Sequence, residues 1–276
     1  MSEAQFIRRR RDPLYSYAGL MALLCELAES AEIVTEENIA RRLADAGDAQ
    51  ANVAAVRSAT EQRAWEGVEA LHGCYTAGVE VDTLAAFFPD VLQWWETFAR
   101  YDRMFDESSG ADGRRVPHLD LHGRDFWRAV RLTSFGILLG HFNLLSRVAT
   151  LWDDGNEEMD GLLERLIAPF VPGRAPPPDT CTRHRPYVQL LEVFDALPDE
   201  RPALMSKYMD EWYAASCCEP YYGSQKKGRE HSYLGLWSFE AAAVTYVLQI
   251  DDSSYRDKDF YPRDLVDYAR SRLRLR

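Results

Sequence analysis

The sequence lacks the short motifs by which most catalytic and nucleotide-binding sites are recognised. It contains no Gly-x-Ser-x-Gly turn, no Gly-x-x-x-x-Gly-Lys loop and no Gly-x-Gly-x-x-Gly segment after a strand. It also has no Cys-x-x-Cys pair. These absences argue against the common serine-hydrolase, P-loop and dinucleotide-binding classes, and against a thioredoxin-like redox pair or a zinc knuckle.

Cysteine is scarce and poorly placed for disulfide bonds. The five cysteines include one adjacent pair, Cys217 and Cys218, and wide gaps separate the others. An odd count with this spacing is not a disulfide framework, and free cysteines are typically small buried residues. We therefore expect Cys25 and Cys74 to lie in the core and the protein to occupy a reducing compartment.

The chain also lacks a long apolar run. Its longest apolar windows are Phe135 to Leu145 and Phe239 to Ile250, which are interrupted by His141 or Glu240. Both are shorter than the roughly 20 residues that cross a bilayer. The basic run Arg8 to Arg11 is not followed by the apolar core of a secretory signal. These features predict a cytoplasmic protein.

Acidic side chains outnumber basic ones. The chain has 44 aspartates and glutamates against 32 lysines and arginines, which gives a formal net charge of −12. Basic residues also gather at the two ends, in Arg8 to Arg11 and in Arg270, Arg272, Arg274 and Arg276. The acidic body between them repels phosphate backbones and suits a basic protein partner, although solubility alone would explain the same charge.

Apolar residues recur at helical spacing along nearly the whole chain, and no sustained alternation of apolar and polar residues predicts a strand. Thr35 suits the N-cap of a short helix that ends near Leu43. Pro89 is expected to start a new helical turn. Asp125 to Trp152 predicts one long helical segment. The sequence therefore predicts an all-α protein.

The stretch from Pro169 to Pro186 is rich in proline and cannot be helical throughout. We interpret it as an extended connection laid over a helical body, with a hinge between domains as the alternative. We predict a compact, bundle-like body made of two helical parts, residues 1–150 and 151–276, which this proline-rich connection joins.

The last forty residues carry the most specific pattern. A helix apolar nearly all round is predicted from Gly235 to Gln249, with Glu240 as its only charged residue. Because a buried carboxylate needs a partner, we expect Glu240 to pair with an arginine. Asp251 to Ser254 predict a turn of capping residues, and Pro262 suits the first turn of a final helix.

This segment resembles the C-terminal part of the PoNi family of bacterial immunity proteins. The likeness rests on a Gly-Leu-Trp-Ser-Phe-Glu-Ala-Ala-Ala run, an Ile-Asp-Asp-Ser-Ser turn and a Phe-Tyr-Pro-x-Asp-Leu-Val-x-Tyr-Ala-Arg end. Leu236 and Phe260 stand where the family usually has tyrosine. The most conspicuous motif residues are Trp237, Phe239, Glu240, Tyr261 and Pro262, and we expect Trp237 and Phe239 to lie in the core. Thinner likeness upstream extends the resemblance over most of the chain.

The resemblance implies a function. PoNi proteins protect bacteria from PoNe-type DNase toxins of the PD-(D/E)xK superfamily, which are used in interbacterial competition and commonly delivered by type VI secretion. A member would bind its toxin stoichiometrically, without a cofactor and without direct nucleic-acid or membrane contact. We expect the toxin contacts at five aspartates that lie near helix ends and should be exposed. They are Asp251, Asp252, Asp257, Asp259 and Asp264. We prefer them to the acidic cluster Asp153, Asp154, Glu157 and Glu158.

Two alternatives remain at this point. His118, Asp120 and His122 are the best metal-ligand set in the sequence and would suit a metal-dependent hydrolase. The glycines around them favour a solvated loop instead. The other alternative is a helical scaffold or regulator that binds a different protein. The resemblance favours an immunity protein over both.

Overall fold

The computed structural model describes residues 1–110, 117–123, 125–226 and 233–273, and these residues form helices, turns and irregular segments without a strand. The all-α prediction is confirmed. The α-helices and one 3-10 helix, η1, have these bounds: α1 Glu3–Arg9, α2 Tyr17–Ile33, α3 Glu36–Leu43, α4 Ala49–Thr76, α5 Val81–Ser109, α6 Phe126–Leu138, η1 Phe142–Leu144, α7 Leu145–Asp153, α8 Gly161–Ile167, α9 Gln189–Asp195, α10 Arg201–Ala215, α11 Phe239–Val247 and α12 Arg263–Leu273.

The chain forms two compact units, and each unit consists of three separate stretches of the sequence. Unit 1 comprises Met1–His118, Leu151–Gly155 and Lys227–Gly235, and unit 2 comprises Leu119–Thr150, Asn156–Lys226 and Leu236–Arg276. The proline-rich connection therefore lies inside unit 2. The predicted division into residues 1–150 and 151–276 stays a prediction, because a compact body of contacts is not by itself a folding domain.

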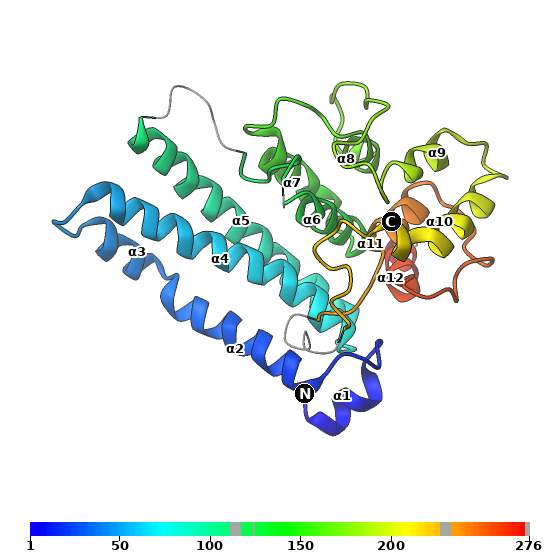
Figure 1. The fold of residues 1–276 in the computed structure, drawn as a ribbon, viewed down its shortest axis with the longest axis horizontal. Coiled ribbons are helices and arrows are strands. Elements are labelled where there is room, and N and C mark those ends of the chain that lie inside the picture. Colours follow the sequence, from blue (N-terminus) through cyan, green and yellow to red (C-terminus); the bar gives the residue numbers. More distant parts are fainter. Residues whose placement is uncertain (111–116, 124, 227–232, 274–276) are drawn as a thin grey trace. The chain divides into compact units, whose positions relative to one another are not determined.

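In unit 1, the two long helices α4 and α5 pack side by side, and α2 and α3 lie along the other side of α4 (Figure 1). Gly67 makes the helix contact close, since a Cβ there would lie 2.8 Å from the Trp94 ring. Pro89 was predicted to start a new helical turn, and this prediction is wrong. Pro89 lies inside α5, which is continuous through it.

The short helix α3 matches its prediction, because Thr35 caps it by accepting a hydrogen bond from the Asn38 amide (3.1 Å) and it ends at Leu43. None of its residues is buried. A helix of this length has little intrinsic stability, so its apolar side must rely on the flanking helices.

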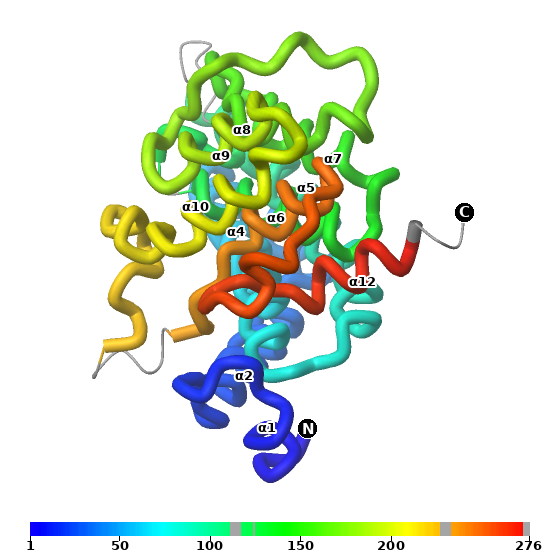
Figure 2. Tube along the Cα trace, turned by 90° about the vertical axis from the view of Figure 1, so that its right-hand side faces the viewer, coloured from blue at the N-terminus to red at the C-terminus, as the bar shows by residue number. Residues whose placement is uncertain are grey.

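In unit 2, α11 packs against α6, α8 and α12, and every residue from Phe239 to Tyr246 is buried. Phe239 meets Phe135 of α6 with ring centroids 4.6 Å apart. The helix α12, red in Figure 2, is the last helix of the described chain. The segment predicted as one helix from Asp125 to Trp152 is broken after α6, where Gly140 takes a left-handed φ of 80°.

Cys25 and Cys74 were both predicted to lie in the core. Cys25 is exposed on α2 rather than buried, and Cys74 is partly buried. Burial raises the pKa of the Cys74 thiol to about 11. Within the described residues, no helix combines the length and apolar character needed to span a bilayer.

Candidate functional site: the C-terminal aspartate cluster

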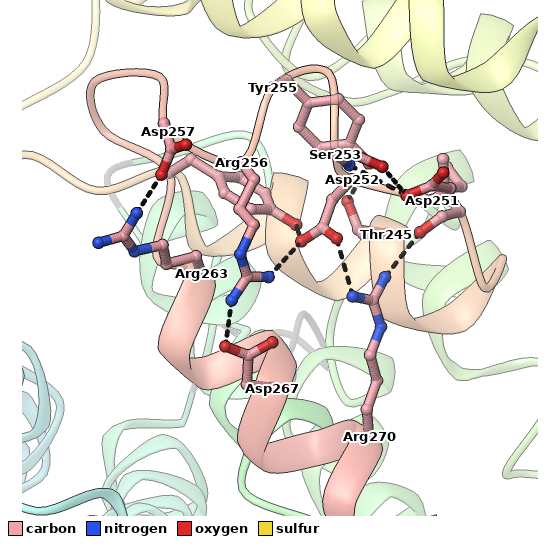
Figure 3. Close-up of polar contacts among 12 residues, drawn as sticks. Thr245, Asp251, Asp252, Ser253, Tyr255, Arg256, Asp257, Arg263, Asp267 and Arg270 are labelled. Carbon is pink, nitrogen blue, oxygen red and sulfur yellow. Dashed lines mark hydrogen bonds and ion pairs between the residues drawn. The ribbon is translucent and has the colours of Figure 1, made fainter.

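The turn between α11 and α12 carries most of the predicted toxin contacts, and Asp252 is its centre (Figure 3). Asp252 was expected to be exposed, but only 4% of its surface is accessible. Its carboxylate accepts hydrogen bonds from Arg270 Nη1 (2.8 Å), Arg256 Nη1 (3.1 Å) and the Tyr261 hydroxyl (3.2 Å). A carboxylate enclosed in this way is unavailable to another protein.

The two arginines extend this network beyond Asp252. Arg270 of α12 also donates to the Ile250 carbonyl (2.6 Å), and Arg256 also binds Asp267 of α12. The hydrogen bond to Asp267 raises the pKa of Arg256 above its ordinary value. Asp252 therefore acts as an internal anchor that fastens the turn after α11 to the last helix.

The other four aspartates of the predicted set have different surroundings. Asp251 is exposed and accepts hydrogen bonds from Ser253, which lower the pKa of its carboxyl. Asp257 is exposed and paired with Arg263, and Asp264 is half-buried. Asp259 is exposed and forms no ion pair within the described part of the chain. Only part of the predicted cluster thus offers accessible negative charge.

Glu240 is buried, as its position on an apolar helix predicted, but the expected arginine partner is wrong. Its Oε1 accepts hydrogen bonds from the Trp212 indole N–H (2.6 Å), the Ser238 hydroxyl (2.8 Å) and the Tyr208 hydroxyl (3.0 Å). Burial raises the pKa of Glu240, because the loss of water around the carboxylate disfavours its charged form. The side chain fastens α11 to α10.

The remaining motif residues are mostly core. Phe239, Tyr261 and Pro262 are buried, and the Tyr261 ring meets Tyr255 edge-on at 5.2 Å. Trp237 was expected in the core but is only half-buried. The motif that carries the family resemblance is therefore chiefly a packing motif around α11 and α12.

The predicted metal ligands bind other partners. In unit 1, His118 is buried with its ring nitrogens 2.7 Å from Asp102 and 3.2 Å from Asp154. In unit 2, His122 is exposed with Nε2 3.8 Å from Glu158. Asp120 accepts a hydrogen bond from the backbone amide of His122 (2.9 Å). Over the described ranges, no group of three or more histidine, cysteine or acidic residues is arranged to hold a metal ion.

Glu219 is a further buried carboxylate of unit 2, and no signal in the sequence pointed to it. Glu219 lies 3.5 Å from Arg183 in an ion pair and accepts a hydrogen bond from the Tyr187 hydroxyl (3.3 Å). Burial raises the pKa of Glu219. No spacing rule links these residues, because they approach each other only in the tertiary fold. The Asp252–Arg256 pair did have a local signal, its i, i+4 spacing.

Comparison with known proteins gives a structural likeness and a match to a family model. The crystal structure of protein PA2201 from Pseudomonas aeruginosa matches with a TM-score of 0.74 at 23% sequence identity, and the match covers 96% of this chain and 91% of that chain. At this identity the likeness establishes the fold alone. No curated protein matches the sequence. Residues 158–265 match the family model of the C-terminal domain of PoNe immunity proteins (PoNi). The matched residues contain α8 to α11 and the aspartate-rich turn, so this part of the chain is similar to the C-terminal domain of PoNi proteins.

Proposed function

We propose that this protein is an immunity protein that binds a PoNe-type DNase toxin and neutralises it as a stoichiometric inhibitor. The observation that carries the proposal is the PoNi match over residues 158–265. The net charge of −12 supports it, because a nuclease must present a basic surface to DNA and an acidic protein is attracted to that surface.

Inhibition in this proposal occurs by occupation of a surface rather than by chemistry. The acidic inhibitor covers the face that the toxin offers to DNA, and apolar anchors in the contact supply most of the affinity. The chain needs no catalytic group and no cofactor of its own for this function. The site of action is the cytoplasm, where an incoming DNase reaches the chromosome. Delivery of the toxin by type VI secretion belongs to the same proposal.

The aspartate cluster contributes unequally in this proposal. Asp251, Asp257, Asp259 and Asp264 stay proposed contacts. The role of Asp252 is revised to positioning, since its carboxylate is enclosed by Arg256 and Arg270. A substitution at Asp252 would then affect toxin binding through stability and not through a lost contact.

The test uses the PoNe-type toxin encoded beside the gene of this chain. Its nuclease domain is purified with and without this protein, and plasmid cleavage and complex formation are measured over a range of molar ratios. Cleavage that stops at equimolar protein, with a stable complex, supports the proposal. A neighbouring nuclease that is neither bound nor inhibited contradicts it, as does the absence of any nuclease gene beside this one.

A further inference from the structure

The α3 helix of unit 1 lies beside an open apolar groove. This α3 groove has a volume of about 380 Å³ and lies between the end of α2, α3 and α4. Glu32, Asn38 and Arg42 also line it. Its apolar lining consists of Ile33, Val34, Ile39, Ala55, Val56 and Ala59. A second cavity of about 530 Å³ lies at α3 and shares Val34 and Ile39 with the groove. Because no residue of α3 is buried, the helix leaves apolar surface uncovered along its length.

The α2 helix also carries exposed apolar side chains. Met21, Cys25 and Ala28 recur at helical spacing and all three are exposed. Leu24 is 37% exposed, and Ile33 at the edge of the groove is 60% exposed. Exposed apolar side chains that gather beside a groove are typical of a protein interface. We call these exposed α2 side chains and the groove together the α2–α3 face.

Negative charge predominates around this face. The segment from Tyr17 to Ala40 contains five glutamates and no lysine, arginine or histidine, and two arginines, Arg41 and Arg42, follow at the end of α3. All five are exposed, and none forms an ion pair in the part of the chain that the structure describes. They are Glu26, Glu29, Glu32, Glu36 and Glu37. The C-terminal aspartates differ, because arginines neutralise Asp252 and Asp257.

We propose that the α2–α3 face is the docking surface for the basic, DNA-binding face of the nuclease toxin. This inference rests on the function proposed above and names the surface that performs it. An apolar side chain of the toxin enters the α3 groove, while lysines and arginines that otherwise contact DNA phosphates pair with the five glutamates. Apolar insertion supplies binding energy, and the charges supply rate and specificity.

The charge pattern favours this occupant over a second copy of the chain. In a symmetric dimer the same patch meets itself, so the five glutamates of one copy would face those of the other. Like charges brought together in this way oppose association. The face also lies outside residues 158–265, which the family model matches. A surface that has to fit one toxin is free to differ there while the shared C-terminal domain keeps the fold.

The test compares three variants of the full chain against a catalytically inactive form of the neighbouring nuclease domain. The first reverses charge on the face, as Glu29→Lys with Glu32→Lys and Glu36→Lys. The second, Ile33→Asp, places a charge at the edge of the groove. The matched control reverses two exposed acidic residues of unit 2 to which neither proposal assigns a role, as Glu192→Lys with Asp199→Lys. Every substituted side chain is exposed, so we expect each variant to fold. Circular dichroism and the melting temperature verify this.

We expect the triple variant to lose at least about a hundredfold in affinity and to associate about tenfold more slowly near 0.1 M salt, because surface charge sets the encounter rate. Ile33→Asp should lose about tenfold or more, mainly through faster dissociation. The control should stay within about threefold of the unmodified chain, as expected for charges at the rim of a contact or outside it.

Each of the other possible results contradicts a different part of the proposal. If the unmodified chain binds and the α2–α3 variants bind equally well, the docking surface is wrong while the immunity function stands. If the control loses as much affinity as the triple variant, the overall charge of the chain and not the α2–α3 face sets the affinity, and the docking surface is wrong. If light scattering shows that the unmodified chain is a dimer that Ile33→Asp dissociates, a second copy covers the face. If the unmodified chain does not bind, the proposed function fails, and with it the occupant of the face.

Discussion

Asp252 offers the sharpest test of how the family motif works, because it looks like a surface aspartate in the sequence and is an anchor in the structure. The change is Asp252→Ala, with Asp251→Ala as the matched control. The two carboxylates are adjacent in the chain, but only Asp252 is buried and holds two arginines. An electrostatic account based on sequence would treat them alike.

The structure sets the magnitude. Removing one partner of a fully buried ion pair costs about 3–5 kcal/mol, since the remaining charge loses its counterion. Here the side chains of Arg256 and Arg270 are 31% and 34% exposed, so water can replace part of what is lost. We expect Asp252→Ala to lower the free energy of unfolding by about 2–3 kcal/mol and Asp251→Ala by less than about 0.5 kcal/mol.

Urea unfolding followed by circular dichroism measures both values, and Asp252→Asn separates charge from shape. The asparagine variant keeps an acceptor for the Tyr261 hydroxyl and should lose about half as much stability as alanine. Toxin binding at a temperature where the variant is folded should be unchanged. Equal losses at positions 251 and 252, or a loss at 252 below about 0.5 kcal/mol, would refute the anchor.

Three more predictions concern buried polar side chains. Burial raises the pKa of Glu240 above its ordinary value of 4.5, so the folded state holds the proton more tightly than the unfolded state. The unmodified chain therefore loses stability as pH rises from about 4.5 through the folded pKa. The Glu240→Gln variant does not titrate at this position, so urea titrations should show it gaining stability relative to the unmodified chain over that range. Trp212→Phe removes the 2.6 Å bond to that carboxylate and should lower the urea midpoint by an amount equivalent to about 1–3 kcal/mol. Asp160 caps α8 and also binds Thr182, so Asp160→Ala should cost about 2–4 kcal/mol in the same assay, while Thr182→Val should cost about 1 kcal/mol.

The C-terminal motif shows how far pattern reasoning reaches. Glu240 was predicted to be buried because apolar residues surround it on a helix, and it is. Its partners were predicted wrongly, because Tyr208 and Trp212 lie about thirty positions away, on another helix. Hydrophobic periodicity records which side of a helix faces the core. It carries no information on which donors from distant segments meet there.

Pro89 and Gly140 show, for a related reason, that one proline or glycine does not by itself decide where a helix ends. Pro89 was expected to restart a helix, yet α5 continues through it, since packing of the long helix outweighs one lost backbone hydrogen bond. The α6 helix ends just before Gly140, although the apolar pattern predicted continuity to Trp152. A local preference of one residue is small compared with the burial of a whole helix face, so tertiary context decides such positions.

The amino-acid sequence was sufficient to predict the all-α class, the capped helix after Thr35, the burial of Glu240 and the resemblance to PoNi proteins. Each of these depends on residues close together in the chain or on composition. The tertiary structure alone decided which carboxylates are enclosed and which are accessible. It placed Asp252 between two arginines, separated the partners of His118 from those of His122, and left the acidic α2–α3 face open. The physical reason is that accessibility depends on contacts between distant segments, which the fold brings together.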